Sequence, residues 1–202
     1  MKKSIVLTSL IFLVNSTALF AQNQTFDADV SQSKLAWTGK KIGGKHNGLV
    51  KIKSGFISFK DGKPEAGKFE IDLTTISCSD LTDPAKNADL VNHLKSDDFF
   101  SVEKYPISTL TITKFSPIEK APKGQPNYKV FGNLNIKGKN NPIEFPAYID
   151  VKGKTLTGKA DFSIDRTKWD ITYKSGTIFP SLADKAIADN IDFSVFIKAT
   201  SK

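Results

Sequence analysis

Apolar and polar residues alternate with a period of two along most of this chain. Val50 and Ile52 alternate with lysines, and a second segment with Phe69, Ile71 and Leu73 alternates with charged residues. Because successive side chains of a β-strand point to opposite faces, this pattern is typical of half-buried strands. Roughly eight such segments follow one another, mostly joined by short turns. The pattern predicts an all-β fold and favours a small antiparallel barrel.

The alternation changes phase within one of the predicted strands. Ile52 lies on one parity, whereas Ile57 and Phe59 lie on the other. The change falls at Ser54-Gly55, and a glycine at such a place predicts a β-bulge. A bulge bends a strand, as the closure of a barrel requires.

The longest interruption of the alternation begins at Asp83. This aspartate is suited to cap a helix, and Pro84 is suited to the first helical position. We therefore predict a helix over Asp83–Lys95, which crosses one end of the barrel as a short lid. Phe99 and Phe100 follow it, and at least one of them should reach the core.

The apolar faces of the predicted strands define the inside of the barrel. Small residues, among them Ala147 and Ala160, stand between large ones on these faces. They leave either a tunnel wide enough for one apolar ligand or a solid core in which small and large side chains interdigitate. The residues predicted to line the tunnel are Trp37, Val50, Ile52, Phe69, Ile71, Leu73, Leu110, Ile112, Leu134, Ile136, Phe145, Ala147, Ala160, Phe162, Phe193 and Val195.

The first residues have the pattern of an export signal. Lys2 and Lys3 precede an apolar run that is too short for a comfortable membrane span, and Ala21 closes the segment. We predict a signal peptide over residues 1–21, cleaved after Ala21, and one domain over residues 22–202. The protein is therefore expected in the periplasm or outside the cell.

The charge and composition of the chain limit the kinds of molecule that it is expected to bind. The 202 residues carry a net charge of +8, largely from lysines that alternate with apolar residues along the strands. This arrangement indicates a solvated outer face, and it also allows transient contact with an anionic membrane surface. Nucleic-acid binding is not expected, because the basic residues form no concentrated stripe with aromatics. Cys78 is the single cysteine, so it is expected to be a small buried residue without a disulfide partner.

Motifs of catalysis are missing from the sequence. It contains no His-Glu-x-x-His, no Gly-x-Ser-x-Gly and no phosphate-binding glycine loop. His46 and His93 lie far apart and lack Cys or His companions at metal-ligand spacing, so no metal or other cofactor is expected. Asp97 and Asp98 suit the end of a helix better than a general acid and base. We therefore expect that the protein is not an enzyme.

Several segments together resemble the YceI family of exported lipocalin-like barrels that bind polyisoprenoids and related amphiphiles. The central segment, with leucine, aspartate, phenylalanine, tyrosine and proline at fixed spacing, is the most specific. Asn135 departs from the threonine that the family usually has there. The matching segments are Trp37-Thr38-Gly39-Lys40, Lys45-His46-Asn47-Gly48, His93-Leu94-Lys95-Ser96-Asp97-Asp98-Phe99-Phe100, Glu103-Lys104-Tyr105-Pro106, Gly132-Asn133-Leu134-Asn135-Ile136-Lys137-Gly138 and Ile164-Asp165-Arg166-Thr167-Lys168-Trp169.

The resemblance implies an eight-stranded antiparallel lipocalin-like barrel with an apolar tunnel and a helical lid. Its ligand would be a polyisoprenoid, an isoprenoid quinone or a fatty-acid derivative, held for transport or storage, and no catalytic residue is implied. Two alternatives stay open: an enzyme or redox helper acting on an isoprenoid lipid, and a purely structural barrel.

Polar residues in the matching segments are candidates for the mouth of the tunnel, where they would orient a head group. Asp165 and Arg166 have a second reading, as an ion pair at the end of a strand. The predicted mouth residues are His46, His93, Asp165, Arg166 and Tyr173.

Overall fold

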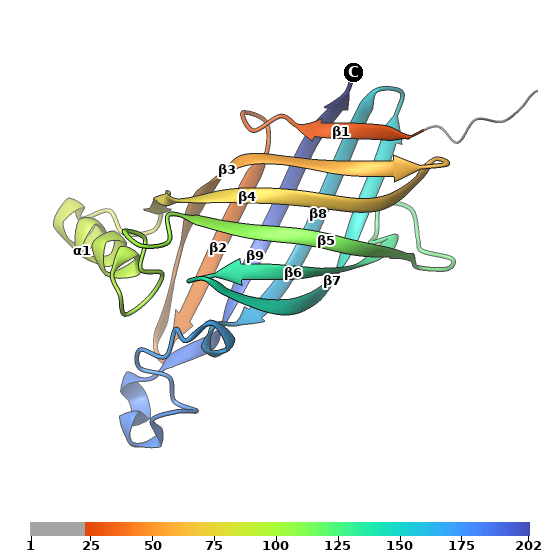
Figure 1. Ribbon diagram of the computed structural model, residues 1–202. Helices are drawn as coiled ribbons and strands as arrows, with labels where there is room; N and C mark the ends of the chain where they lie inside the picture. The colour runs from red at the N-terminus through yellow and green to blue at the C-terminus, as the bar shows by residue number, and fades with distance from the viewer. Residues whose placement is uncertain (1–22) are drawn as a thin grey trace, which may run out of the picture.

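The computed structural model describes residues 23–202 (Figure 1). The predicted signal peptide lies outside these residues, so its cleavage stays a prediction. The strands are β1 (Gln24–Ala28), β2 (Lys34–Lys41), β3 (Gly44–Lys60), β4 (Lys63–Cys78), β5 (Ile107–Pro117), β6 (Tyr128–Ile136), β7 (Lys139–Lys152), β8 (Thr155–Asp165) and β9 (Ile187–Ser201). The helices are α1 (Pro84–Lys95) and two short 3-10 helices, η1 (Arg166–Trp169) and η2 (Pro180–Lys185).

The strands form one antiparallel sheet that closes on itself. Neighbours run in the order β3-β2-β9-β8-β7-β6-β5-β4, and the pairing of β4 with β3 closes the barrel. β1 and β2 share one position in the barrel, because each of them pairs with both β3 and β9. Phe26 of β1 lies opposite Ile57 of β3, and Trp37 of β2 lies opposite Gly48 of β3. The predicted eight-stranded antiparallel barrel is confirmed, with one of its positions divided between two strands.

The β3 strand bends where the sequence predicts a bulge. Its register against β4 shifts between Ile52 and Ser54, as the phase change indicated. A Cβ atom at Gly55 would lie 2.1 Å from Cδ1 of Phe69, so a larger residue would drive β3 away from β4. The glycine therefore permits the close approach of these two strands as the barrel curves.

The predicted helix is present as α1. The side chain of Asp83 caps it by accepting hydrogen bonds from the backbone N–H groups of Ala85 and Lys86, at 2.9 and 3.2 Å. Beyond the helix Phe99 is buried, with 7% of its surface exposed, whereas Phe100 is half-buried. The prediction that one of these two rings reaches the core is confirmed.

Removal of the cap should destabilise the protein modestly. Replacing Asp83 by alanine leaves two N–H groups of the first turn without that acceptor, and the free energy of unfolding should fall by about 1 kcal/mol. Urea titration followed by circular dichroism measures the change. Asp89→Ala, at an exposed position of the same helix, is the matched control and should be nearly neutral. Equal destabilisation by both changes would contradict a capping role.

The helix and the segment after β8 lie at the same end of the barrel (Figure 1). The ring of His93 in α1 contacts the ring of Tyr173, and Nζ of Lys137 donates to the backbone oxygen of Asp97. The end of the barrel near α1 is thus covered by two segments that are far apart in sequence.

Within residues 23–202, no helix combines the length and the apolar character that crossing a membrane would need.

Candidate functional site

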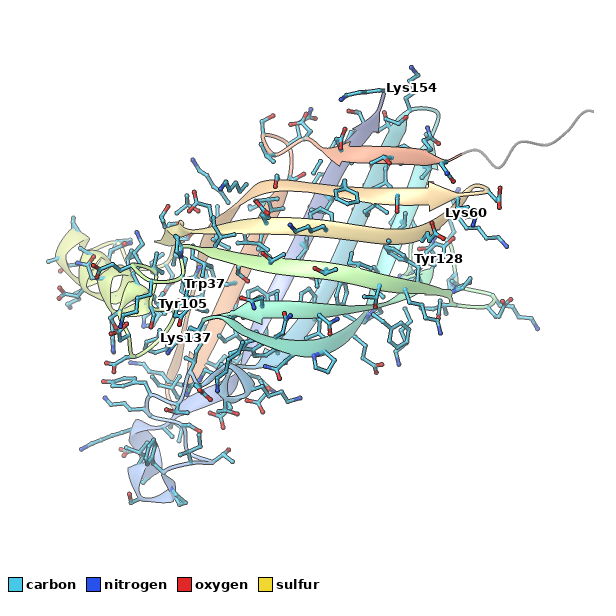
Figure 2. All side chains as sticks on the ribbon, viewed as in Figure 1. Trp37, Lys60, Tyr105, Tyr128, Lys137 and Lys154 are labelled. Atoms are coloured by element: carbon cyan, nitrogen blue, oxygen red, sulfur yellow. The ribbon has the colours of Figure 1, made fainter. Side chains whose placement is uncertain are left out.

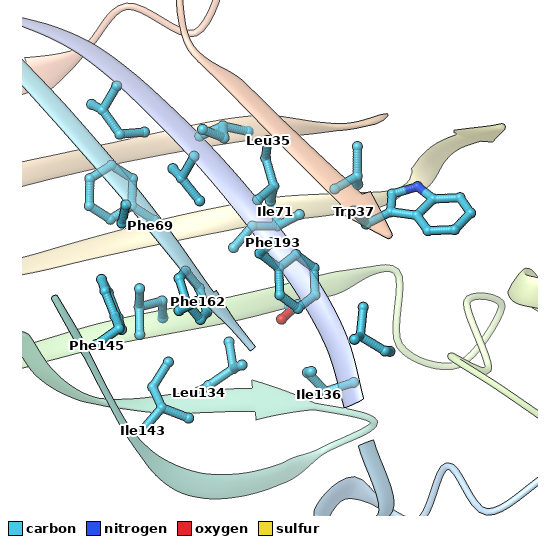
Figure 3. A pocket seen from close by; sticks show the side chains of 18 of the residues that line it. Leu35, Trp37, Phe69, Ile71, Leu134, Ile136, Ile143, Phe145, Phe162 and Phe193 are labelled. Atoms are coloured by element: carbon cyan, nitrogen blue, oxygen red, sulfur yellow. The ribbon is translucent and has the colours of Figure 1, made fainter. Parts of the chain in front are cut away.

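The barrel encloses an apolar cavity (Figure 3). Its volume is about 200 Å³, well above the roughly 10–15 Å³ that a cavity needs to hold one water molecule. Strands β2 to β9 all contribute to the wall, and Leu94 of α1 and the rings of Phe99 and Phe100 contribute at the covered end. Every residue predicted from the sequence to line a tunnel lies in this wall, although their binding of a lipid stays a prediction.

Aromatic side chains on three adjacent strands form part of the wall. Phe145 of β7 stacks on Phe162 of β8, with ring centroids 4.4 Å apart. Phe162 in turn lies 5.6 Å from Phe193 of β9. These rings alternate with polar outward residues, as the period of two requires. They give the cavity a hydrocarbon surface along one side.

Two polar side chains in the wall, Trp37 and Ser108, are bonded to the backbone. The indole N–H of Trp37 donates to the carbonyl oxygen of Ser77 at 3.2 Å, close to the α1 end of the barrel (Figure 2). The hydroxyl of Ser108 donates to the carbonyl oxygen of Asn135 at 2.7 Å. Because these donors are satisfied within the protein, they do not compete for polar groups of a ligand. The cavity therefore suits a hydrocarbon chain rather than a polar molecule.

Arg166 lines the cavity, but its guanidinium bonds to groups of the protein itself. Only 1% of the residue is exposed, and Nε, Nη1 and Nη2 donate to the carbonyl oxygens of Ala188, Ile171 and Ile187 at 3.1, 2.7 and 3.1 Å. Nη2 also lies 3.3 Å from Oδ1 of Asp189. Burial lowers the pKa of Arg166, and the charge of Asp189 opposes this shift. The side chain thereby fastens η1 and the residues after it to the start of β9.

The neighbouring Asp165 has a separate local role. Its carboxylate caps η1 by accepting hydrogen bonds from the backbone N–H and the hydroxyl of Thr167, at 3.0 and 2.6 Å. The ion-pair partner of Arg166 is Asp189, and Asp165 faces its own helix end. The suggested Asp165–Arg166 ion pair is thus replaced by two different contacts.

His93 and Tyr173 meet above the covered end of the cavity. Their ring centroids are 4.6 Å apart, and the ring of His93 lies 5.0 Å from that of Phe99. Nε2 of His93 also lies 3.0 Å from Oδ2 of Asp98. Because Phe99 lines the cavity, this aromatic cluster joins α1 and the segment after η1 at the covered end of the cavity. His93 and Tyr173 do not line the cavity themselves, but both rings contact Phe99, which does.

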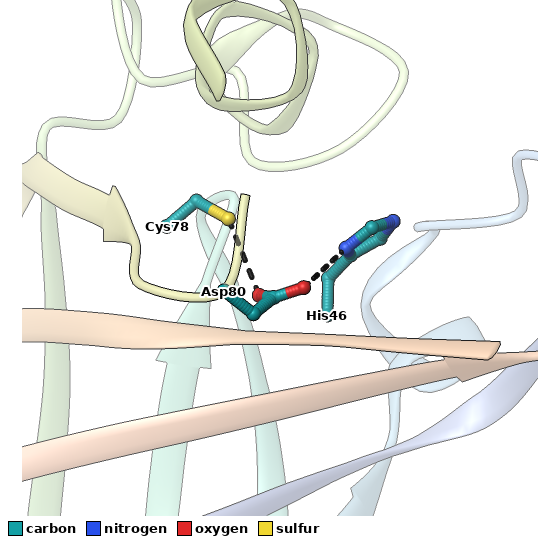
Figure 4. A group of neighbouring side chains, drawn as sticks. All are labelled: His46, Cys78 and Asp80. Carbon is teal, nitrogen blue, oxygen red and sulfur yellow. Dashed lines mark hydrogen bonds and ion pairs between the residues drawn. The ribbon is translucent and has the colours of Figure 1, made fainter. Parts of the chain in front are cut away.

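His46 has different neighbours from the other predicted mouth residues. Its Nδ1 lies 2.8 Å from Oδ2 of Asp80, and Sγ of Cys78 lies 3.4 Å from Oδ1 of the same carboxylate (Figure 4). The backbone N–H of Asn47 is the main cause that lowers the pKa of Asp80 to about 2, and His46 and Cys78 lower it further. Sequence reasoning did not associate these residues, because Asp80 is 34 positions from His46 and belongs to no motif.

Comparison with known proteins gives one consistent family. Residues 26–199 match the family model of the YceI-like domain. A "UPF0312 protein" of Pseudomonas putida is 29% identical over 164 residues, which cover 77% of this chain and 80% of that protein. A "UPF0312 protein" of Pseudomonas syringae pv. tomato is 30% identical over 159 residues, which cover 74% and 77%.

Solved structures share the fold at lower identity. BcnA of Burkholderia cenocepacia is 22% identical, with a TM-score of 0.61 over 86% of this chain and 99% of that one. A domain of Saccharophagus degradans, described as polyisoprenoid-binding and implicated in plant cell wall breakdown, is 14% identical, with a TM-score of 0.62 over 88% and 98%. At these identities the likeness establishes the barrel fold.

Proposed function

Because this chain belongs to the YceI-like family, we propose that it is an exported binding protein that holds a long-chain amphiphile for transport or storage. The observation that carries the proposal is the apolar cavity of about 200 Å³ inside a closed barrel, with the polar groups Trp37 Nε1 and Ser108 Oγ of its wall satisfied by the backbone. Burial of each methylene group in such a space contributes about 0.8 kcal/mol. A long chain is therefore held firmly without specific polar contacts.

The apolar wall of the cavity also indicates the class of ligand. A polyisoprenoid, an isoprenoid quinone or a fatty-acid derivative each offers a chain that the rings of Phe145, Phe162 and Phe193 can contact. The likeness to a domain described as polyisoprenoid-binding supports the first of these. The head group would lie by the aromatic cluster of His93, Phe99 and Tyr173, which covers the end near α1.

Exchange of the ligand would involve transient contact with a membrane surface. Ile178 and Phe179, in the segment before η2, are 43% and 47% exposed, and Ile42, after β2, is 61% exposed. These residues belong to one end of the barrel, because Lys41 pairs with Ile187 where that segment rejoins β9. Apolar side chains beside lysines suit the boundary of an anionic membrane. The export signal predicted for the first residues accords with a ligand taken from such a membrane outside the cytoplasm.

Organic extraction of the purified protein followed by mass spectrometry tests the proposal. We expect one long-chain amphiphile per protein molecule after gentle purification from its native host. Extraction should empty the cavity, and a polyisoprenoid or quinone added back should raise the melting temperature, since a ligand that binds only the folded state stabilises it. Protein that contains no lipid and is not stabilised by any of the three ligand classes would contradict the proposal. Conversion of the added lipid would instead support the enzyme alternative.

A further inference from the structure

Three side chains with metal-binding atoms gather at the rim of the barrel near α1. They are His46 at the start of β3, Cys78 at the end of β4 and Asp80 just after it (Figure 4). One nitrogen, one sulfur and one oxygen atom of this group all lie within 4.8 Å of one another. Within residues 23–202, no second group of three such side chains comes together in this way. The site is separate from the cavity, since none of the three residues lines it.

Strand register brings the group together. Trp37 lies opposite Gly48, and Gly48 lies opposite Cys78, so the three strands align these positions side by side. His46 has the parity of the inward-facing Gly48 and lies one step nearer the rim. A Cβ atom at Gly48 would lie 1.7 Å from the backbone oxygen of Ser77 and 2.9 Å from Cζ2 of Trp37, so the glycine lets both β4 and the indole approach β3 closely. The group consequently stands just beyond the indole that closes this part of the cavity wall.

Hydrogen bonds hold the carboxylate of Asp80 and the backbone of the turn after β4 in place. The backbone N–H of Asn47 donates to Oδ1 of Asp80 at 2.8 Å, which leaves Oδ2 directed at Nδ1 of His46. The side-chain amide of Asn87 in α1 donates to the carbonyl oxygens of Cys78 and Leu81, at 3.0 and 2.9 Å. The turn that carries Asp80 is therefore fixed from both sides. Such outer contacts orient ligands in known metal sites.

We propose that His46, Cys78 and Asp80 bind one Zn²⁺ ion, with the fourth position open to water or to a polar group of a ligand. Zinc prefers sulfur at about 2.3 Å and nitrogen or oxygen at about 2.0–2.2 Å, so neighbouring ligand atoms in a tetrahedron lie roughly 3.3–3.8 Å apart. The three ligand atoms of this group lie within 4.8 Å of one another, so small movements of the side chains would bring them to these spacings. Binding would release the thiol proton to solvent, and the zinc–thiolate bond would replace the contact between the thiol and the carboxylate.

The thiol of Cys78 distinguishes this group from the surroundings of the other histidine, His93. His93 likewise lies beside a carboxylate, with Nε2 at 3.0 Å from Oδ2 of Asp98. The rings of Phe99 and Tyr173 flank His93, whereas Cys78 completes the group around His46. A histidine–carboxylate pair with a thiol offers three zinc ligands, and one without a thiol offers two. His93→Gln is therefore the matched control for changes in the proposed site.

The experiment uses purified protein without a polyhistidine tag, titrated with Zn²⁺ in competition with a chromogenic chelator. We expect one equivalent to bind. Cys78→Ser, His46→Gln and Asp80→Asn should each weaken binding by more than about tenfold, because even outer partners of a metal site contribute about 10–100-fold. His93→Gln should leave the affinity unchanged. Circular dichroism of each variant verifies that it is folded.

A second measurement needs no variant. Co²⁺ added to the unmodified protein should give the near-ultraviolet thiolate charge-transfer band and visible bands of a tetrahedral site. Two results would overturn the proposal. One is a Zn²⁺ affinity that falls with Cys78→Ser but not with His46→Gln, since this indicates a thiol acting alone. The other is a cobalt spectrum without the charge-transfer band.

Discussion

Replacing Ala147 by tryptophan should expel the ligand from the barrel while the fold survives. Ala147 lies in β7, and its small side chain borders the cavity between Phe145 and Ile149. An indole there would occupy space that the ligand chain otherwise fills. If it displaces about four methylene groups, the lost burial is about 3 kcal/mol, which corresponds to a rise of more than a hundredfold in Kd. Lipid that co-purifies with the variant, measured by mass spectrometry, should fall accordingly.

The control for this variant places the same side chain on the outside of the same strand. Glu144 is exposed and pairs with Lys129 across the outer face, so Glu144→Trp should retain the ligand. Thermal melting of both delipidated variants completes the test. If Ala147→Trp lowers the stability by about 1–3 kcal/mol and the unmodified protein carries no lipid, the barrel is solid in solution and the indole overpacks it.

Replacing Arg166 by methionine should destabilise the protein strongly. Methionine has a similar length but cannot donate to the carbonyl oxygens of Ala188, Ile171 and Ile187. It also leaves the carboxylate of Asp189 without its ion-pair partner. Removal of one member of a buried charge pair costs about 3–5 kcal/mol. Urea unfolding should therefore show a large fall in the free energy of unfolding.

A second change separates the charge from the hydrogen bonds. Asp189→Asn in the Arg166→Met background removes the unpaired charge and should restore part of the lost stability. Lys168→Met, at an exposed position of η1, should be close to neutral. If Arg166→Met is also near neutral, the guanidinium is not what fastens η1 to β9.

Local features of the sequence determined most of the architecture. The period of two placed the wall residues on one face of each strand, and all those predicted to line a tunnel lie in the wall of the cavity. Asp83 and Pro84 marked the start of α1, because capping depends on neighbouring residues only. Gly55 marked the bend of β3. β1 escaped notice, since its five residues bury only Phe26 and are too short to show alternation.

The partners of the polar residues were decided by the tertiary structure. Nothing near Arg166 in the sequence indicates that its guanidinium turns inward to carbonyl groups at the start of β9, 21 and 22 residues later. His46 reaches Asp80 across 34 residues only because β3 pairs with β4 so that Gly48 lies opposite Cys78. Alternation reports which face a side chain occupies, and it carries no information about which strand lies beside it. The sequence alone therefore determined the barrel and its apolar interior, whereas barrel closure assembled the rim, where charged side chains find their partners.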